Sequence, residues 1–289
     1  MKTRIFTLAL MSSLIIASCT KKDNEDNTTI SDDEAIVNTN IDMAADDVSN
    51  VIEEQLLLTN SDASSRGTAS LFAGCATITR TPAAGTVPII GNTVSKVINF
   101  GAAGCLQPNG NRLRGIINMS FIYNPSATEQ VVTYIFENFF HNSTKFNGQK
   151  TFTRSMTVGT ATNPSHPIVV MDMDMLVTLA DGRTLTRKGT RTREMTAGFG
   201  TVALNDNEFK VTGEWTTTYP NTSVQTSTIV NPLLVKLSCI ASNSALVSQG
   251  TINFVRNSNN ATLDYGAGNC DNEAVFTLNG VSRTITLKR

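Results

Sequence analysis

A repeated run of glycines ahead of a cysteine is the feature that most constrains the fold of this chain. Residues Asp264–Cys270 have the sequence DYGAGNC, and residues Asn99–Cys105, far upstream, have the related sequence NFGAAGC. Each run follows an earlier cysteine, Cys239 or Cys75, at nearly the same distance. We therefore expect one supersecondary unit that is used twice within a single body.

The N-terminus has the pattern of an export signal. Basic residues precede the apolar run Ile5–Ile16, which is too short to span a bilayer, and small residues precede Cys19. Residues Leu14–Cys19 resemble the bacterial lipobox, and this resemblance implies removal of a signal peptide 1–18 and lipid modification of Cys19. Several acyl chains on one residue would hold the protein stably on a membrane. An ordinary secretory signal is the alternative.

The segment behind Cys19 bears on where the protein resides. Residues Thr20–Asp26 resemble the lysine-plus-acid export tag of surface lipoproteins in Bacteroidota, although a solvated charged tether has the same composition. We expect a lipid-anchored protein of the outer membrane. Whether it faces the cell surface or the periplasm stays open.

The four cysteines behind Cys19 are even in number, which in an exported protein favours disulfides. Three pairings are possible. Because the repeat makes the segments 75–105 and 239–270 equivalent, we predict the bonds Cys75–Cys105 and Cys239–Cys270, which close loops of 29 and 30 intervening residues. In the chain-entropy model each bond would stabilise the fold by about 3 to 4 kcal/mol.

Composition predicts an all-β body. The chain is 40% hydrophobic and 16% charged, and it is rich in glycine, threonine and asparagine. We expect an antiparallel meander of many strands over residues 71–289, either sandwich-like or one large twisted sheet. Residues 19–70 would hold the lipidated cysteine, an acidic tether and a short helix from about Asn40 to Leu57, with Ala44 and Val48 on its apolar face.

Charge divides at the boundary between these segments. Residues 20–66 hold 12 acids and 3 bases, a net charge of −9, whereas residues 67–289 hold 12 acids and 18 bases, a net charge of +6. Either the acidic segment folds back onto the basic body, or a basic face of the body meets anionic glycan or lipid headgroups. The candidate face is a stripe of five basic residues: Arg183, Arg187, Lys188, Arg191 and Arg193.

Turn signals set the expected strand pairing. Asn147-Gly148, Asp181-Gly182 and Asn279-Gly280 are typical of two-residue hairpin turns. A two-residue turn at Asp181-Gly182 would place Asp172 opposite Arg191 and would line the other face, which we expect to be buried, with Met171, Met173 and Met175.

Signs of catalytic or metal chemistry are few. His141 and His166 are the only histidines, and no hydrolase, zinc-protease or phosphate-loop motif is present. Asp264, Asp271 and Glu273 flank the second predicted disulfide, where carboxylates could bind Ca²⁺, but their spacing matches no calcium loop and tight turns favour the same residues. We predict no catalytic residue, no cofactor, no metal and no nucleic-acid partner.

The half-motifs CATIT at Cys75, NFG at Asn99, DYG at Asp264, CDN at Cys270 and the hairpin LNG at Leu278 together resemble uncharacterised lipoproteins of Bacteroidota. The resemblance covers about residues 71–289 and implies an envelope location, but it brings no established activity and no catalytic residues. We expect a non-enzymatic binding or structural module that contacts envelope glycan or another envelope protein. The alternative is an all-β polysaccharide-active enzyme with paired carboxylates.

Overall fold

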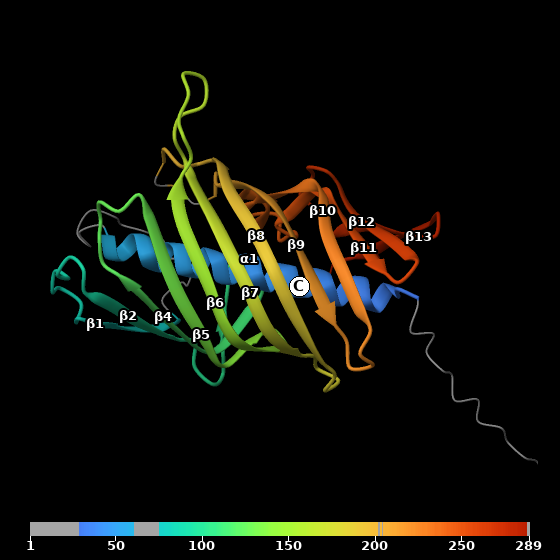
Figure 1. The fold of residues 1–289 in the computed structure, drawn as a ribbon, viewed down its shortest axis with the longest axis horizontal. Helices are drawn as coiled ribbons and strands as arrows, with labels where there is room; N and C mark the ends of the chain where they lie inside the picture. Colours follow the sequence, from blue (N-terminus) through green and yellow to red (C-terminus); the bar gives the residue numbers. More distant parts are fainter. Residues whose placement is uncertain (1–28, 61–74, 202, 204, 288–289) are drawn as a thin grey trace, which may run out of the picture.

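A computed structural model describes residues 29–60, 75–201, 203 and 205–287. It is one open antiparallel sheet that curves around a single long helix, α1 (Asp32–Asn60) (Figure 1). Strands follow one another along the sheet in chain order, without helical crossovers. The all-β meander predicted from composition is therefore confirmed, as one large sheet and not a sandwich. The tether was expected over residues 20 to about 33; residues 20–28 of it lie outside the described residues, and its end from Asp32 is already part of α1. Residues 61–70 of the second linker also lie outside the described residues.

The sheet contains fourteen strands, and β3 pairs only with β4, off the main path. A short 3-10 helix, η1 (Leu237–Ile240), follows the tenth strand. The strands are β1 (Thr77–Thr81), β2 (Thr93–Asn99), β3 (Cys105–Leu106), β4 (Arg112–Ile122), β5 (Glu129–His141), β6 (Thr144–Met156), β7 (Pro167–Thr178), β8 (Thr184–Ala197), β9 (Glu208–Thr218), β10 (Val224–Lys236), β11 (Val247–Arg256), β12 (Asn259–Ala267), β13 (Glu273–Leu278) and β14 (Val281–Thr286).

Helix α1 is longer than the predicted span of 40–57. It begins early because Ser31 and Glu34 form a capping box: the Glu34 N–H donates to Ser31 Oγ at 3.2 Å, and the Ser31 N–H donates to Glu34 Oε2 at 3.1 Å. Every residue from Ile41 to Ser49 is buried, which means that the helix is enclosed on all sides along its middle turns. Ala44 and Val48 are in the core, as predicted.

The core lies between α1 and the concave face of the sheet. Along β7 the burial alternates strictly, with Met171, Met173 and Met175 buried and the intervening aspartates exposed. This is the pattern of a strand with one wet and one dry face, and it confirms the prediction of a buried methionine face.

The predicted register of the β7–β8 hairpin is wrong by one residue. Asp172 lies opposite Thr190, and Met171 is the residue opposite Arg191. The loop has three residues instead of two, because the Leu179 N–H pairs with the Arg183 carbonyl and Gly182 alone takes a positive φ, of 86°. A slip of one residue moves every side chain to the other face, so the arginines of β8 that were expected outside point into the core.

Two other turn predictions have opposite outcomes. Asn279-Gly280 is a two-residue turn in which both residues have positive φ, 50° and 80°, and Leu278 pairs with Val281. Asn147-Gly148 is not a turn but lies inside β6, opposite Leu176 and Met175 of β7. The chain reverses just ahead of it, at Asn142, whose φ is 54°.

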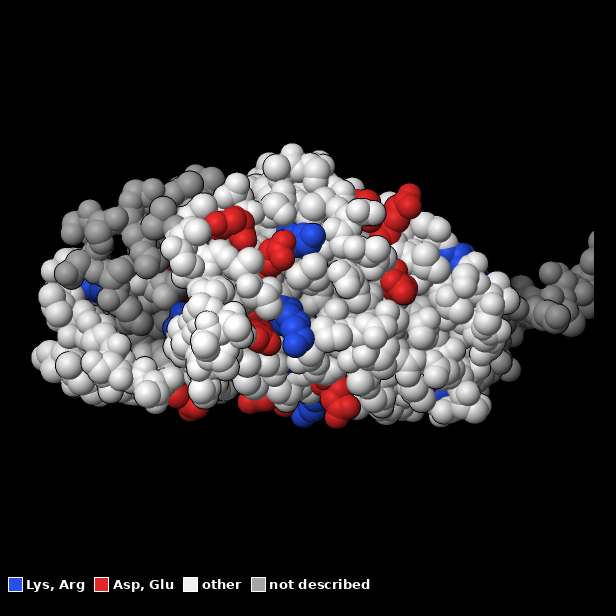
Figure 2. All heavy atoms as spheres, turned by 90° about the horizontal axis from the view of Figure 1, so that it is seen from above, with Lys and Arg blue, Asp and Glu red and all other residues white. Residues whose placement is uncertain are grey.

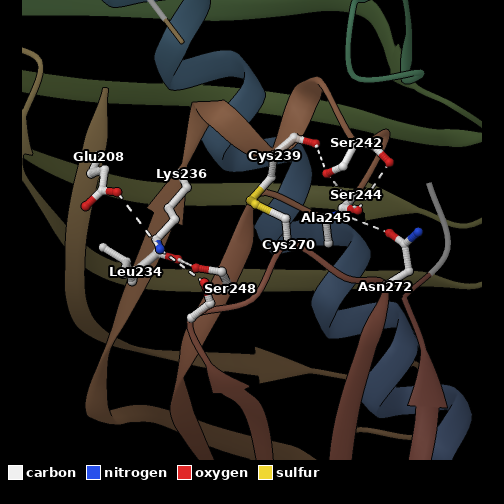
Figure 3. The surroundings of a disulfide bond; sticks show 11 residues. Glu208, Leu234, Lys236, Cys239, Ser242, Ser244, Ala245, Ser248, Cys270 and Asn272 are labelled. Carbon is white, nitrogen blue, oxygen red and sulfur yellow. Dashed lines mark hydrogen bonds and ion pairs between the residues drawn. A yellow bond between two sulfur atoms is a disulfide. The ribbon is translucent and has the colours of Figure 1, made fainter. Parts of the chain in front are cut away.

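Both predicted disulfides are present, with chain separations of 30 and 31 residues. Each closes one hairpin, β1–β2 or β11–β12, and we call the segments 75–105 and 239–270 the stapled units. The repeat is also structural: Asn99 Oδ1 accepts the Gly101 N–H at 2.8 Å, and Asp264 Oδ1 accepts the Gly266 N–H at the same distance. Figure 3 shows the second disulfide, which ties η1 to the loop behind β12.

Candidate functional site

The main concentration of titratable side chains lies inside the molecule, where α1 meets the sheet. The helix carries a stripe of polar residues at every fourth position: Glu34, Asn38, Asp42, Asp46, Asn50 and Glu54. At 3.6 residues per turn, a spacing of four keeps neighbouring side chains on one face while the stripe winds slowly around the axis. Most of these side chains meet cationic or hydroxyl groups that project from the concave face.

Asp42 is at the centre of this interface. Its Oδ1 accepts from Arg187 Nη2 at 2.7 Å and lies 3.4 Å from Arg191 Nη1, and all three side chains are at most 2% exposed. The Arg187 guanidinium lies 4.3 Å from the centre of the Trp215 ring. Gly189 of β8 pairs with Trp215 of β9 and leaves room for the indole, because a Cβ at position 189 would lie only 2.6 Å from Trp215 Cβ.

Two more arginines hold the helix towards its ends. Arg193 donates to Glu53 Oε2 at 3.1 Å and stacks on the Phe209 ring at 3.4 Å. Arg256 donates to Glu34 Oε1 at 2.9 Å, near the first turn of α1. Charge-assisted bonds of this kind are the strong ones inside proteins, so the register of α1 against the sheet is fixed along its length.

The predicted basic stripe is therefore not one surface. Arg187, Arg191 and Arg193 are at most 5% exposed and face α1. Arg183 and Lys188 are exposed and pair with Asp181 at 2.7 Å and with Asp174 at 2.9 Å. On the face of the molecule in Figure 2, acidic and basic side chains are scattered among each other. Of the two explanations for the divided charge, the structure shows the first, in which the acidic segment folds onto the basic body.

Two buried lysines, Lys96 and Lys150, add to the positive charge that the sheet presents to α1. Burial lowers the pKa of Lys96 to about 8, helped by the nearby Arg80. Burial also lowers the pKa of Lys150 to about 7, and the charges of Arg187 and Arg191 act in the same direction. Desolvation of this kind disfavours the charged form of any buried lysine.

Asp46 lies next to this cationic cluster. Burial raises its pKa in spite of the opposing charge of Arg191, whose Nη2 is 3.6 Å from Asp46 Oδ1. The interface therefore holds charged groups that are only partly matched to one another.

A second polar cluster surrounds Asp47. Its carboxylate contacts Asn109 Nδ2 and Asn111 Nδ2, each at 2.7 Å, and His141 Nε2 at 2.8 Å. A small cavity there is lined by Asp47, by Asn109 from the turn after β3 and by Leu246 from the segment after η1. Each of these loops follows a disulfide cysteine, Cys105 or Cys239, so the loop just behind the first stapled unit and a loop within the second come together over the helix.

His166 pairs with Glu194, Nε2 to Oε1 at 2.9 Å, while its Nδ1 faces the Pro164 carbonyl at 2.7 Å. The hydrogen bond to Glu194 raises the pKa of His166, and that to Pro164 adds to the rise. Both histidines singled out from the sequence are thus structural, each held by one carboxylate.

Replacing His166 by glutamine is expected to change how stability depends on pH. Because the folded-state pKa is raised, the stabilising contribution is complete below the unfolded value near 6.5 and is lost as pH rises through the folded value. Chemical denaturation at closely spaced pH values should show this loss in the wild type and not in H166Q. Glu194→Gln serves as the matched variant and should remove the same loss; an unchanged slope in both would contradict the assignment.

The carboxylates near the second disulfide have turn roles. Asp264 accepts the Gly266 N–H, and Asp271 Oδ1 accepts the Glu273 N–H at 3.1 Å. Among the described residues, no group of three or more His, Cys, Asp or Glu side chains could hold a metal ion. The two hydrogen bonds to backbone N–H groups support the interpretation of Asp264 and Asp271 as turn formers.

No family model, curated protein or solved structure matches this chain. Within the part of the chain that the structure describes, no helix is both long and apolar enough to cross a membrane. Cys19, the predicted lipidation site, lies outside the described residues.

Proposed function

We propose that this chain is a lipid-anchored protein of the cell envelope whose β body is a non-enzymatic binding or structural module on the outer membrane. The observation that carries the proposal is the coincidence of the lipobox-like Leu14–Cys19 with two disulfides in the body. Disulfides persist in oxidising compartments outside the cytoplasm, and a lipidated cysteine needs export.

The interior of the body favours a module over an enzyme. A polysaccharide-active enzyme needs two carboxylates about 5 to 10 Å apart beside an open substrate cleft. Here Asp42 and Asp47 are buried between α1 and the sheet and bonded to arginine, asparagine or histidine. Trp215 has the kind of aromatic ring on which a sugar could stack, but it is 1% exposed and is covered by the Arg187 guanidinium. These groups hold the helix in place and offer no free reactive pair.

Loss of the lipid anchor in Cys19→Ala tests the proposal. Cells of a Gram-negative host that express the full chain are fed an alkyne-tagged fatty acid, and the protein is then isolated and labelled. We expect label in the wild type and in the signal-region control Ser12→Ala, and none in C19A. The C19A protein should also leave the membrane fraction. A wild-type protein without label would overturn the lipid anchor.

A further inference from the structure

The last turns of α1 place a lysine and a glutamine in direct contact inside the molecule. Lys96, in the middle of β2, directs its Nζ to Gln55, 3.2 Å from the side-chain Oε1 and 2.5 Å from the backbone carbonyl oxygen. Both residues are at most 5% exposed. The carboxamide carbon is bonded to Oε1, so the lysine nitrogen lies next to the group that it would have to attack.

The surroundings favour reaction over simple hydrogen bonding. The lowered pKa of Lys96, about 8, leaves a sizeable fraction of uncharged amine, the nucleophilic form, near neutral pH. The Nε2 of Gln55 has no hydrogen-bond partner among the described residues. The neighbouring Glu54 lies close enough for its charge to raise the pKa of Lys96, against the effect of burial. The amine and the carboxamide are thus enclosed together, where water does not compete, and the partly buried Glu54 lies nearby.

We propose that Lys96 and Gln55 form an intramolecular isopeptide bond that joins helix α1 covalently to strand β2. The lysine Nζ attacks the Gln55 Cδ, and the new C–N bond forms as the bond from Cδ to Nε2 breaks. Glu54 takes the proton lost by Nζ and passes it to Nε2, which leaves as ammonia. The step needs no oxidant, reductant or other co-reactant, and the chain becomes lighter by one ammonia.

The bond would link the N-terminal segment, and any anchor on it, to the sheet by a route that the two disulfides do not provide. The inference stands apart from the proposed function, because the chemistry depends only on the interior of the folded body. It would hold for a protein without lipid and would fail without any consequence for the anchor.

Mass spectrometry of the full chain, purified, reduced and digested with trypsin, tests the bond. The expected product is residues 23–66 joined to residues 81–112, with cleavage after Lys96 blocked and the mass lower than that of the two linear peptides by one ammonia. Separate linear peptides 23–66, 81–96 and 97–112 in full yield would overturn the proposal.

Variants separate the bond from the fold. Gln55→Met keeps a side chain of similar length but has no carbonyl carbon, and it should give only linear peptides. Glu54→Gln keeps the two reacting groups and should lose the link while a circular dichroism spectrum like that of the wild type shows an intact fold. A link at wild-type yield in E54Q would remove Glu54 from the step; a linked mass in Q55M would overturn the assignment to Gln55.

Discussion

Asp42→Asn is expected to lower the free energy of unfolding by about 3 to 5 kcal/mol, the largest loss that we expect for a single substitution of similar volume. The carboxylate of Asp42 is the shared partner of Arg187 and Arg191, and all three are almost fully enclosed. Asparagine keeps the shape and removes the charge, which leaves Arg187 as a buried cation with no other ion pair among the described residues. Urea denaturation monitored by Trp215 fluorescence measures the change directly, because this ring stacks under Arg187.

Two further variants show whether the loss comes from an unpaired charge. Asp33→Asn makes the same chemical change on the exposed side of α1 and should cost less than about 0.5 kcal/mol. Removing both partners, in Asp42→Leu with Arg187→Met, should recover much of the stability lost in D42N, because Arg187 is then no longer an isolated buried charge. Equal losses in the single and double variants would contradict an origin in the unpaired charge.

The features that could be predicted from the sequence are local ones. The cysteine repeat predicts the disulfides because each pair closes one hairpin, and the alternation around Met171, Met173 and Met175 gives the buried face of β7 directly. The register failed at Asp181-Gly182 because the same dipeptide also fits a three-residue loop, in which only the glycine needs a positive φ. Asn147-Gly148 failed because pairing on both sides of β6 outweighs a turn preference.

The buried contacts between α1 and the sheet could not be predicted from local sequence patterns, because the residues that make them are far apart in the chain. Asp42 and Arg187 are 145 residues apart, and Glu34 and Arg256 are 222 residues apart. One signal is nevertheless present in the sequence: polar residues recur at every fourth position from Glu34 to Glu54, on a face of the helix different from its apolar face. An apolar face opposite a polar one is also the pattern of a surface helix, so the stripe alone does not show that the helix is enclosed; its partners on the sheet do.

The α1–sheet interface contains many buried charged side chains. We infer that they fix the position of α1 on the sheet more than they stabilise the fold. Apolar residues in their place would hold a helix as well or better, but they would allow it to slide by a turn or to rotate. The buried arginines Arg187, Arg191, Arg193 and Arg256 permit only one register of α1. A shift of the helix by four residues would place Asn38 or Asp46 opposite Arg187. The same shift would move Asp47 away from His141. The same register brings Gln55 to Lys96.

Lys150→Met is expected to stabilise the protein by about 2 to 4 kcal/mol at pH 7. Lys150 Nζ has no hydrogen bond to any described residue, and it lies 5.5 Å from the centre of the Phe136 ring. Its folded-state pKa of about 7 lies below the unfolded value near 10.4, so the unfolded chain binds more protons between these two pH values. Wild-type stability should therefore rise as pH increases from about 7 towards 10, by at most about 4 kcal/mol from this group.

The methionine variant should remove the part of the rise that comes from Lys150, because it keeps the volume of the side chain and removes its titration; any rise from Lys96, whose pKa is about 8, remains. Denaturation curves between about pH 6.5 and 9.5 compare wild type, K150M and the exposed control Lys188→Met, whose side chain is 64% exposed and should leave the slope unchanged. The gain of K150M over wild type should be largest at the acidic end and shrink as Lys150 loses its proton in the folded state. A constant gain across the range would mean that the benefit is one of packing alone, and that Lys150 is accommodated in the interior as a charged group.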